Sequence, residues 1–113
     1  MWHIRVRAGF SAAHQIRDHG GHCEQVHGHN YRVEVTISSD VLEPPGMIAD
    51  FADVRSRLKS MLPDHRMLNE VYDFNPTAEN LARRFFDDLR REFPVTRVTV
   101  WEDDDSAAEY SAD

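Results

Sequence analysis

The chain has 113 residues, 41% of them hydrophobic, which is the length of one domain with one modest core. Lys and Arg number 13 against 20 Asp and Glu, and the net charge of −7 argues against a nucleic-acid partner because no basic stripe is available to neutralise phosphates. A single cysteine excludes an internal disulfide, and no segment resembles a signal peptide or is long enough to span a bilayer, so we expect a single domain over residues 1–113 in a reducing cytoplasm.

The N-terminal segment is predicted to be a β-strand. Its apolar residues fall on even positions between polar ones, which is the period of a half-buried strand: Trp2, Ile4, Val6, Ala8 and Phe10. We expect this strand to end at Gly9 or soon after. Residues 11–28 show no sustained period and are rich in glycine and histidine, so they are predicted to form a loop that holds a site.

A second strand is predicted from His29, because apolar residues occupy the odd positions from Tyr31 to Ile37. His27 and His29 are two residues apart and should point to the same face, where they continue this apolar row. Two imidazoles are costly to place there without a partner, so we interpret them as ligands of one metal ion, for which zinc is well suited. His14 is the best candidate for a third ligand, because it lies just past the first strand and an antiparallel pairing would bring it to the start of the second.

Two helices are predicted in the middle of the chain. Asp50 stands at an N-cap position before apolar residues at helical spacing, and Pro63 should stop that helix. Residues 64–69 are predicted to be a loop. The second helix should run from about residues 75–77 to Phe93, with either Asn75 or Thr77 as its cap.

The C-terminal part is predicted to return to β-structure. Residues 96–102 alternate as a third long strand, and a short run from Ala107 to Ser111 could pair beside it. The order of elements predicts an α+β domain with an antiparallel four-stranded sheet and two helices on one face. Such an open sheet has two edges, which favour association with other chains.

Four further polar residues are candidates for chemistry, and three of them also have a structural interpretation. Cys23 could be a small buried hydrophobe, a metal ligand, or an accessible thiol whose pKa is lowered by a nearby positive charge. Asp64 and His65 form either a surface turn or a catalytic pair. Glu102 occupies the inward register at a strand end, where a carboxylate needs a cationic or donor-rich partner.

Several motifs in order along the chain resemble the 6-pyruvoyl-tetrahydropterin synthase family. They are residues 10–14 (FSAAH), the C-x-x-x-H-G-H run of residues 23–29, residues 46–51 (GMIADF), the Asp64-His65 pair with Leu68-Asn69, residues 76–80 (PTAEN) and the late Glu102. The spacing from Cys23 to His29 is most similar to that of the bacterial 6-carboxy-tetrahydropterin synthases. The resemblance implies the tunnelling fold, in which the sheets of several subunits join into an oligomeric barrel, usually a homohexamer built from two trimers.

The resemblance also implies roles for individual residues. His14, His27 and His29 match the family's zinc ligands, Cys23 its general base, His65 a proton relay supported by Asp64, and Glu102 the carboxylate that holds the pterin ring. Thr77 and Glu79 match a motif near the pterin pocket. The family's usual Glu-Thr pair is here Glu102-Asp103, which leaves the pterin anchor intact but removes the threonine.

The implied reaction converts 7,8-dihydroneopterin triphosphate to 6-carboxy-5,6,7,8-tetrahydropterin, with release of acetaldehyde and triphosphate, on the route to queuosine and related deazapurines. Arg5, Arg7, Lys59, Arg66 and side chains of a neighbouring subunit remain open as partners of the triphosphate. One alternative is the sibling synthase, which only eliminates triphosphate from the same substrate. The other is an oligomeric zinc-binding module without turnover, for which a fourth structural ligand would be the sign.

Overall fold

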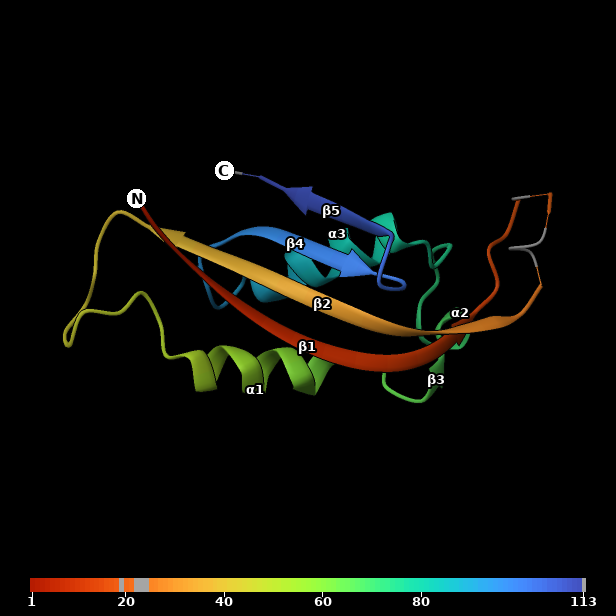
Figure 1. Cartoon of the computed structure of the whole chain (residues 1–113), viewed down its shortest axis with the longest axis horizontal. Coiled ribbons are helices and arrows are strands. Elements are labelled where there is room, and N and C mark those ends of the chain that lie inside the picture. Colours follow the sequence, from red (N-terminus) through yellow and green to blue (C-terminus); the bar gives the residue numbers. More distant parts are fainter. Residues whose placement is uncertain (19, 22–24, 113) are drawn as a thin grey trace.

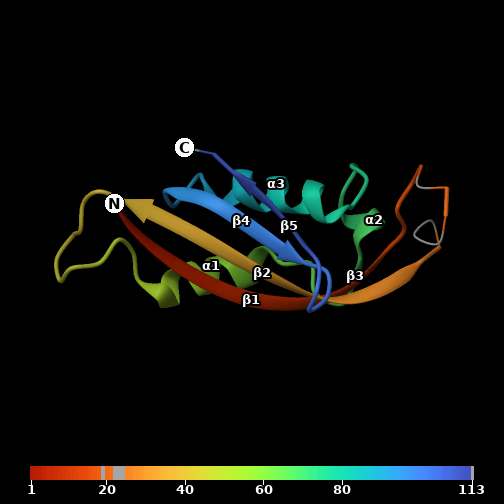
Figure 2. The same cartoon turned by 45° about the horizontal axis from the view of Figure 1, so that its top comes forward.

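A long antiparallel hairpin is the central feature of the computed structural model, which describes residues 1–18, 20–21 and 25–112. Its strands, β1 (Trp2–His14) and β2 (His27–Ser39), have 13 residues each and pair along their whole length. The remaining elements are α1 (Phe51–Met61), β3 (Arg66–Met67), α2 (Leu68–Val71), α3 (Ala78–Leu89), β4 (Val95–Trp101) and β5 (Ala107–Ser111). The sheet order is β3-β1-β2-β4-β5, and the hairpin extends beyond β4 at the end where β2 begins (Figures 1 and 2).

The α+β class is confirmed, but the predicted sheet of four antiparallel strands is wrong. The sheet has five strands and is mixed, because β3 pairs in parallel with Ala12 and Ala13 of β1. Residues 64–69, predicted to be a loop, contain β3 and the start of α2, which adds a third helix. Neither element is long enough to produce a hydrophobic period.

The first strand is also longer than predicted. It continues past Gly9 to His14, because Ala12 and His14 keep the inward side of the strand although neither is a large apolar residue. Both ends of the predicted loop of residues 11–28 are therefore strand, since β1 runs to His14 and β2 begins at His27. His14 lies at the end of the strand, directly opposite His27, as the antiparallel pairing required.

The two main helices begin where their caps were expected. Asp50 Oδ1 accepts a hydrogen bond from Ala52 N at 2.7 Å, and Thr77 Oγ1 accepts one from Asn80 N at 3.1 Å, so Thr77 rather than Asn75 caps α3. The first helix ends at Met61, just before Pro63. The second predicted helix, α3, ends at Leu89 instead of Phe93. Phe93 lies in the turn after α3 and packs against the core.

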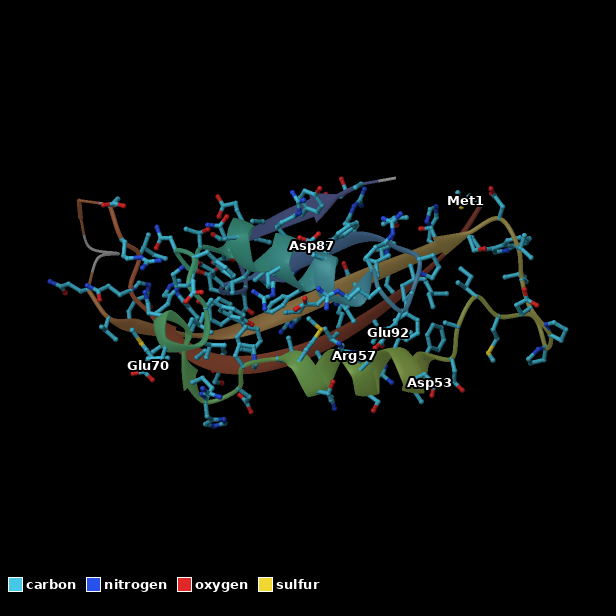
Figure 3. The ribbon with its side chains drawn as sticks, turned by 180° about the vertical axis from the view of Figure 1, so that it is seen from behind. Met1, Asp53, Arg57, Glu70, Asp87 and Glu92 are labelled. Carbon is cyan, nitrogen blue, oxygen red and sulfur yellow. The ribbon has the colours of Figure 1, made fainter. Side chains whose placement is uncertain are left out.

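Both α1 and α3 cover one face of the sheet, where the core lies (Figure 3). Inward residues of β1 alternate at even positions and those of β2 at odd positions, and they meet the apolar sides of α1 and α3. At the boundary between the helices, Arg57 Nε lies 3.0 Å from Glu92 Oε2. No helix among the described residues is long and apolar enough to cross a membrane.

Candidate metal centre

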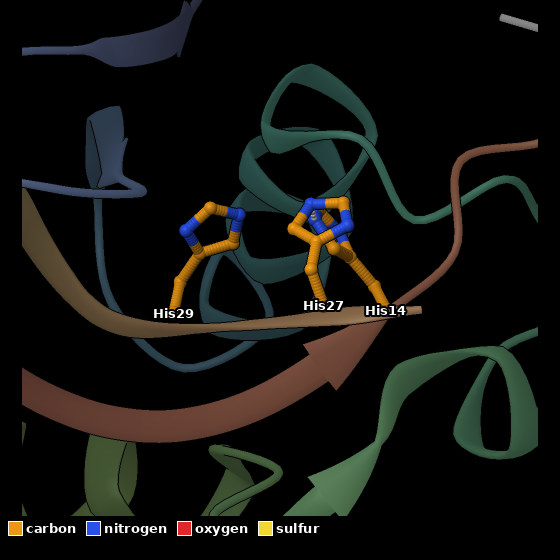
Figure 4. A group of neighbouring side chains, drawn as sticks. All are labelled: His14, His27 and His29. Atoms are coloured by element: carbon orange, nitrogen blue, oxygen red, sulfur yellow. Dashed lines mark hydrogen bonds between the residues drawn. The ribbon is translucent and has the colours of Figure 1, made fainter. Parts of the chain in front are cut away.

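Three imidazoles meet at the end of the core where the hairpin opens. His14 closes β1, His27 and His29 open β2, and all three project from the inward side of their strands (Figure 4). One potential ligand atom from each ring lies within 4.8 Å of the others. Their ring centroids are 4.5 to 5.0 Å apart. The pairing of His14 with His27 and the two-residue spacing to His29 therefore produce the cluster directly from the strand register.

Burial and hydrogen bonding act on the protonation state of His14. His14 is fully buried, and this burial lowers the pKa of its ring below the usual value, against a smaller opposing effect of its hydrogen bond to the Pro76 carbonyl. A lowered pKa keeps the imidazole neutral near pH 7. The neutral form is the one that can bind a metal ion.

The two backbone carbonyls near the cluster select its tautomers. His14 Nδ1 donates to Pro76 O and His27 Nδ1 donates to Gln25 O, each at 2.8 Å, because a carbonyl oxygen can only accept. In the neutral rings both Nε2 atoms then carry lone pairs, and these two atoms are 2.9 Å apart. Two facing lone pairs repel unless a cation lies beside them, so this arrangement fits a metal ion.

His29 supplies a third imidazole nitrogen to the cluster. Its Nε2 is buried and has no hydrogen-bond partner among the described residues, which is costly for a polar atom. Glu102 Oε2 is the acidic group nearby, at 3.9 Å. Three imidazole nitrogens suit a zinc-like ion, and carbonyls such as those of Pro76 and Gln25 commonly orient metal-binding histidines.

Tyr31 belongs to this site although its place in an apolar row suggested only a core residue. Its hydroxyl oxygen lies 3.0 Å from His14 Nδ1, and its ring stacks on Phe10 with centroids 4.7 Å apart. Burial raises the pKa of this hydroxyl, and the negative charge of Glu102 adds to the effect. The signal was in the sequence, since Tyr31 follows His29 by two residues and so shares its face.

A small cavity of about 170 Å³ contains Glu102 beside the start of α3. Glu79 also lines it, so two of the carboxylates singled out from sequence share one space. Thr77 lies at the cap of α3, where its hydroxyl oxygen already accepts from Asn80 N. These three residues are thus gathered near one helix terminus, with Glu102 linking the cavity to the histidines.

Asp64 and His65 lie elsewhere, at the outer edge of β1. Asp64 Oδ1 accepts from Ser11 N at 2.9 Å, and His65 Nδ1 lies 3.0 Å from Asp64 Oδ2. The Ser11 N–H is the main cause that lowers the pKa of Asp64, and hydrogen bonding to His65 adds to it. His65 has a positive φ of 57° and its side chain is 83% exposed. Strands β1 and β2 separate this edge from Glu102 on the β4 side, a span of about 14 Å at ~4.8 Å per strand.

Cys23 lies outside the described residues, as do His19 and His22. The segment that leads toward it is held by two asparagines that the sequence did not single out for this role. Asn69 exchanges two hydrogen bonds of 2.8 and 2.9 Å with the backbone of Gln15, and Asn75 makes the same pair of bonds, both 2.9 Å, with Arg17. Each amide makes the two backbone hydrogen bonds that a neighbouring strand would otherwise make. Side chains therefore fix the path of the chain just beyond His14.

Comparison with known proteins finds a match along nearly the whole chain. A family model described as 6-pyruvoyl tetrahydropterin synthase matches residues 3–113. An Archaeoglobus fulgidus protein provisionally named as a 6-carboxy-5,6,7,8-tetrahydropterin synthase is 42% identical over 109 residues, covering 94% of this chain and 92% of its own. A Synechocystis protein with the same enzyme name is 35% identical over 120 residues, covering 97% and 93%.

Solved structures agree with the fold. The 6-pyruvoyl tetrahydropterin synthase of Caenorhabditis elegans superposes with a TM-score of 0.86 at 25% identity, covering 99% of this chain and 96% of that one. An uncharacterised protein of Wolinella succinogenes superposes with a TM-score of 0.84 at 19% identity, covering 99% and 98%.

Proposed function

The chain belongs to the 6-pyruvoyl tetrahydropterin synthase family, and from this premise we propose that it is a zinc-dependent lyase of queuosine and deazapurine biosynthesis. Its reaction converts 7,8-dihydroneopterin triphosphate and water to 6-carboxy-5,6,7,8-tetrahydropterin, acetaldehyde and triphosphate. The observation that carries this proposal is the cluster of His14, His27 and His29 with Glu102 beside it, in a chain whose relatives bear that enzyme name. We place the enzyme in the cytoplasm.

Zinc is the proposed ion, and the three imidazoles would hold it. When bound, it would act as a Lewis acid that stabilises negative charge developing on a side-chain oxygen of the substrate. The chain's own contribution is to fix the tautomers of His14 and His27 through the carbonyls of Pro76 and Gln25. The inferred open side of the ion faces Glu102, so substrate and metal would meet beside the cavity of Glu79 and Glu102.

Glu102 is the proposed pterin anchor. Its carboxylate would accept two hydrogen bonds from the 2-amino and ring N–H groups of the pterin, a bidentate pattern that also selects the ring. Glu79, in the same cavity, is proposed to accept from a further ring donor. Thr77 keeps its O–H donor and one lone pair for a ligand, because its oxygen accepts a single hydrogen bond in capping α3.

Cys23 is the proposed general base that removes a carbon-bound proton from the substrate side chain, acting as a thiolate. His65 is the proposed relay, with Asp64 accepting from its Nδ1 so that Nε2 is left to take up a proton. Since this pair is exposed at the edge of the sheet, about 14 Å across the strands from Glu102 by strand spacing, we propose that it serves the site of a neighbouring copy.

The edges of the sheet support an assembly of several copies. Among the described residues, β3 pairs with only Ala12 and Ala13 of β1, and β5 ends the sheet on the other side. The strand directions alternate from β1 through β2 and β4 to β5, so β5 of one copy can pair antiparallel with β1 of the next. We propose that three copies close a barrel in this way and that two such trimers form a homohexamer.

The test is incubation of the purified chain with dihydroneopterin triphosphate, with and without a chelator, followed by mass spectrometry of the products. The proposal expects the 6-carboxy product and acetaldehyde in equal amounts, both lost when the metal is removed. A 6-pyruvoyl product without acetaldehyde would assign the chain to the sibling activity, the name borne by the Caenorhabditis elegans structure. A protein that holds zinc but converts nothing would contradict the proposed reaction and favour a non-catalytic binding module.

A further inference from the structure

A row of polar side chains crosses the sheet on the face away from α1 and α3. Arg5 pairs with Thr36, Thr36 with Arg97 and Arg97 with Ser111, so the row spans four adjacent strands. Neighbouring strands lie about 4.8 Å apart, which puts the backbones of the two arginines about 10 Å from one another with Thr36 between them. Two guanidinium groups on long side chains can therefore converge above one threonine hydroxyl.

A second row next to it consists of hydrogen-bonded side chains. His3 pairs with Ser38, and its Nδ1 lies 2.5 Å from Ser38 Oγ. The register between β2 and β4 shifts at Thr36, which leaves Thr96 as an extra residue whose Oγ1 lies 2.8 Å from the same Ser38 Oγ. Bulges of this kind re-aim a side chain and are frequent beside binding sites. Here the bulge adds a hydroxyl to the face that carries the arginines.

The two rows enclose a cavity of about 530 Å³, within the range of small-molecule sites. Thr36 and Ser38 are only 8% and 6% exposed and form its floor, although no helix of the described residues covers this face (Figure 1). Arg5 and Arg97 are exposed and stand at its rim. The cavity thus combines buried hydroxyls below with exposed cationic groups above, which is the pattern of a site for a polar ligand.

This face of the sheet is basic, although the chain as a whole is acidic. The formal net charge is −7, yet the outward positions of β1, β2 and β4 carry four arginines, at positions 5, 7, 32 and 97. Two glutamates offset two of them, with Arg7 Nε 2.8 Å from Glu34 Oε1 and Arg97 Nε 3.4 Å from Glu109 Oε2. Arg5 has no carboxylate partner among the described residues. An anion in the cavity would give Arg5 a negatively charged partner.

We propose that this cavity binds a small phosphate-bearing anion of the diphosphate or triphosphate class. Arg5 and Arg97 would contact phosphate oxygens as fork-shaped donors, and the hydroxyls of Thr36 and Ser38 would donate from below. The site is separate from the metal centre of the same chain, because Arg5 precedes His14 by nine residues on one strand, about 30 Å at ~3.3 Å per residue. The inference does not rest on the proposed reaction.

The test is calorimetric titration of the purified full chain with inorganic tripolyphosphate at low ionic strength, repeated with ATP. The site predicts saturable binding that Arg5→Gln weakens at least tenfold and that Arg5→Lys partly retains. Arg32→Gln is the matched control, since this arginine lies on the same face, opposite Trp101, but does not line the cavity. Tighter binding of tripolyphosphate than of ATP would identify an inorganic ligand, and the reverse an organic one.

Three outcomes would overturn the proposal. One is the lack of saturable binding for both anions. Another is an equal loss in Arg32→Gln and Arg5→Gln, which would reduce the effect to the general charge of the face. The third is binding that survives Arg5→Gln but disappears in His29→Ala, which would put the anion at the histidine cluster. Circular dichroism of each variant would verify that these exposed substitutions leave the fold intact.

Discussion

Replacing His29 with alanine separates the metal-binding role of the histidine cluster from its role in packing. His29 Nε2 is buried and has no hydrogen-bond partner in the part of the chain that the structure describes, which costs about 1–3 kcal/mol when no ion is bound. Removal of the ring relieves this cost. It also loses about 1–2 kcal/mol of stabilisation from buried apolar surface, since the side chain is only 20% exposed. The two effects oppose each other. We therefore expect the metal-free variant to unfold with a free energy within about 1 kcal/mol of the native chain.

The effect of zinc on stability should differ sharply between the two proteins. At a zinc concentration a hundred times its Kd, binding stabilises the native chain by about 2.7 kcal/mol, which corresponds to roughly 10 °C in Tm for a chain of this length. Loss of a residue that hydrogen-bonds to a metal ligand weakens metal binding by about 10–100-fold. Loss of a ligand itself should therefore weaken zinc binding by more than about 100-fold. At the same zinc concentration His29→Ala should then gain less than about 0.4 kcal/mol.

Thermal unfolding with and without zinc, together with the measured zinc content, tests both expectations. His65→Ala is the matched control, because this histidine is 83% exposed and lies outside the cluster, so it should keep the full zinc-dependent rise in Tm. A His29→Ala protein that keeps this rise in Tm, or a His65→Ala protein that loses it, would refute the assignment of the zinc ligands. A metal-free His29→Ala protein that is several kcal/mol less stable would show instead that the ring is mainly a packing residue.

Three other substitutions address the remaining proposed roles. Glu102→Ala should weaken binding of a pterin such as sepiapterin by a few kcal/mol while zinc content stays near one per chain, and unchanged pterin affinity in a fluorescence titration would refute the anchor. Cys23→Ala should keep zinc and pterin binding but lower turnover roughly a hundredfold to ten-thousandfold, whereas loss of zinc would make Cys23 a ligand. The Ser11 N–H lowers the pKa of Asp64, so its carboxylate should stabilise the fold above the unfolded value of about 3.9 and lose that contribution as pH falls through the lower folded value. Urea unfolding should accordingly show a stability deficit of Asp64→Asn near pH 7 that shrinks as pH falls below about 4, and a deficit independent of pH would contradict this origin.

The histidine cluster was predictable because it depends on two short-range rules. Side chains two apart on a strand share a face, which relates His27 to His29, and an antiparallel pair brings strand ends together, which adds His14. Both rules act on the backbone and need no knowledge of the rest of the fold. The cap at Asp50 was predictable for the same reason, since a cap is a contact within three residues, and Thr77 was one of the two cap candidates for the second helix.

The parts that sequence reasoning missed depend on distant partners. The carbonyl that orients His14 comes from Pro76, 62 residues away, and any residue could supply a carbonyl. The pairing of β3 with Ala12 and Ala13 has no period because it is two residues long. Asn75 was a cap candidate and Asn69 part of a family motif, and only the fold shows that their amides bond to the backbone of Gln15 and Arg17.

The hairpin has a consequence for how this chain can change over evolutionary time. Because β1 and β2 pair continuously from Trp2 with Ser39 to His14 with His27, every residue of one strand has a numbered counterpart on the other. Inserting or deleting one residue in the middle of β1 would turn every side chain on one side of the change to the opposite face. Either His14 would leave the cluster of imidazoles or Arg5 would leave its row beside Thr36. Substitutions can accumulate along this hairpin, but a change in its length should be tolerated only outside the paired segments, in residues 15–26 and 40–50.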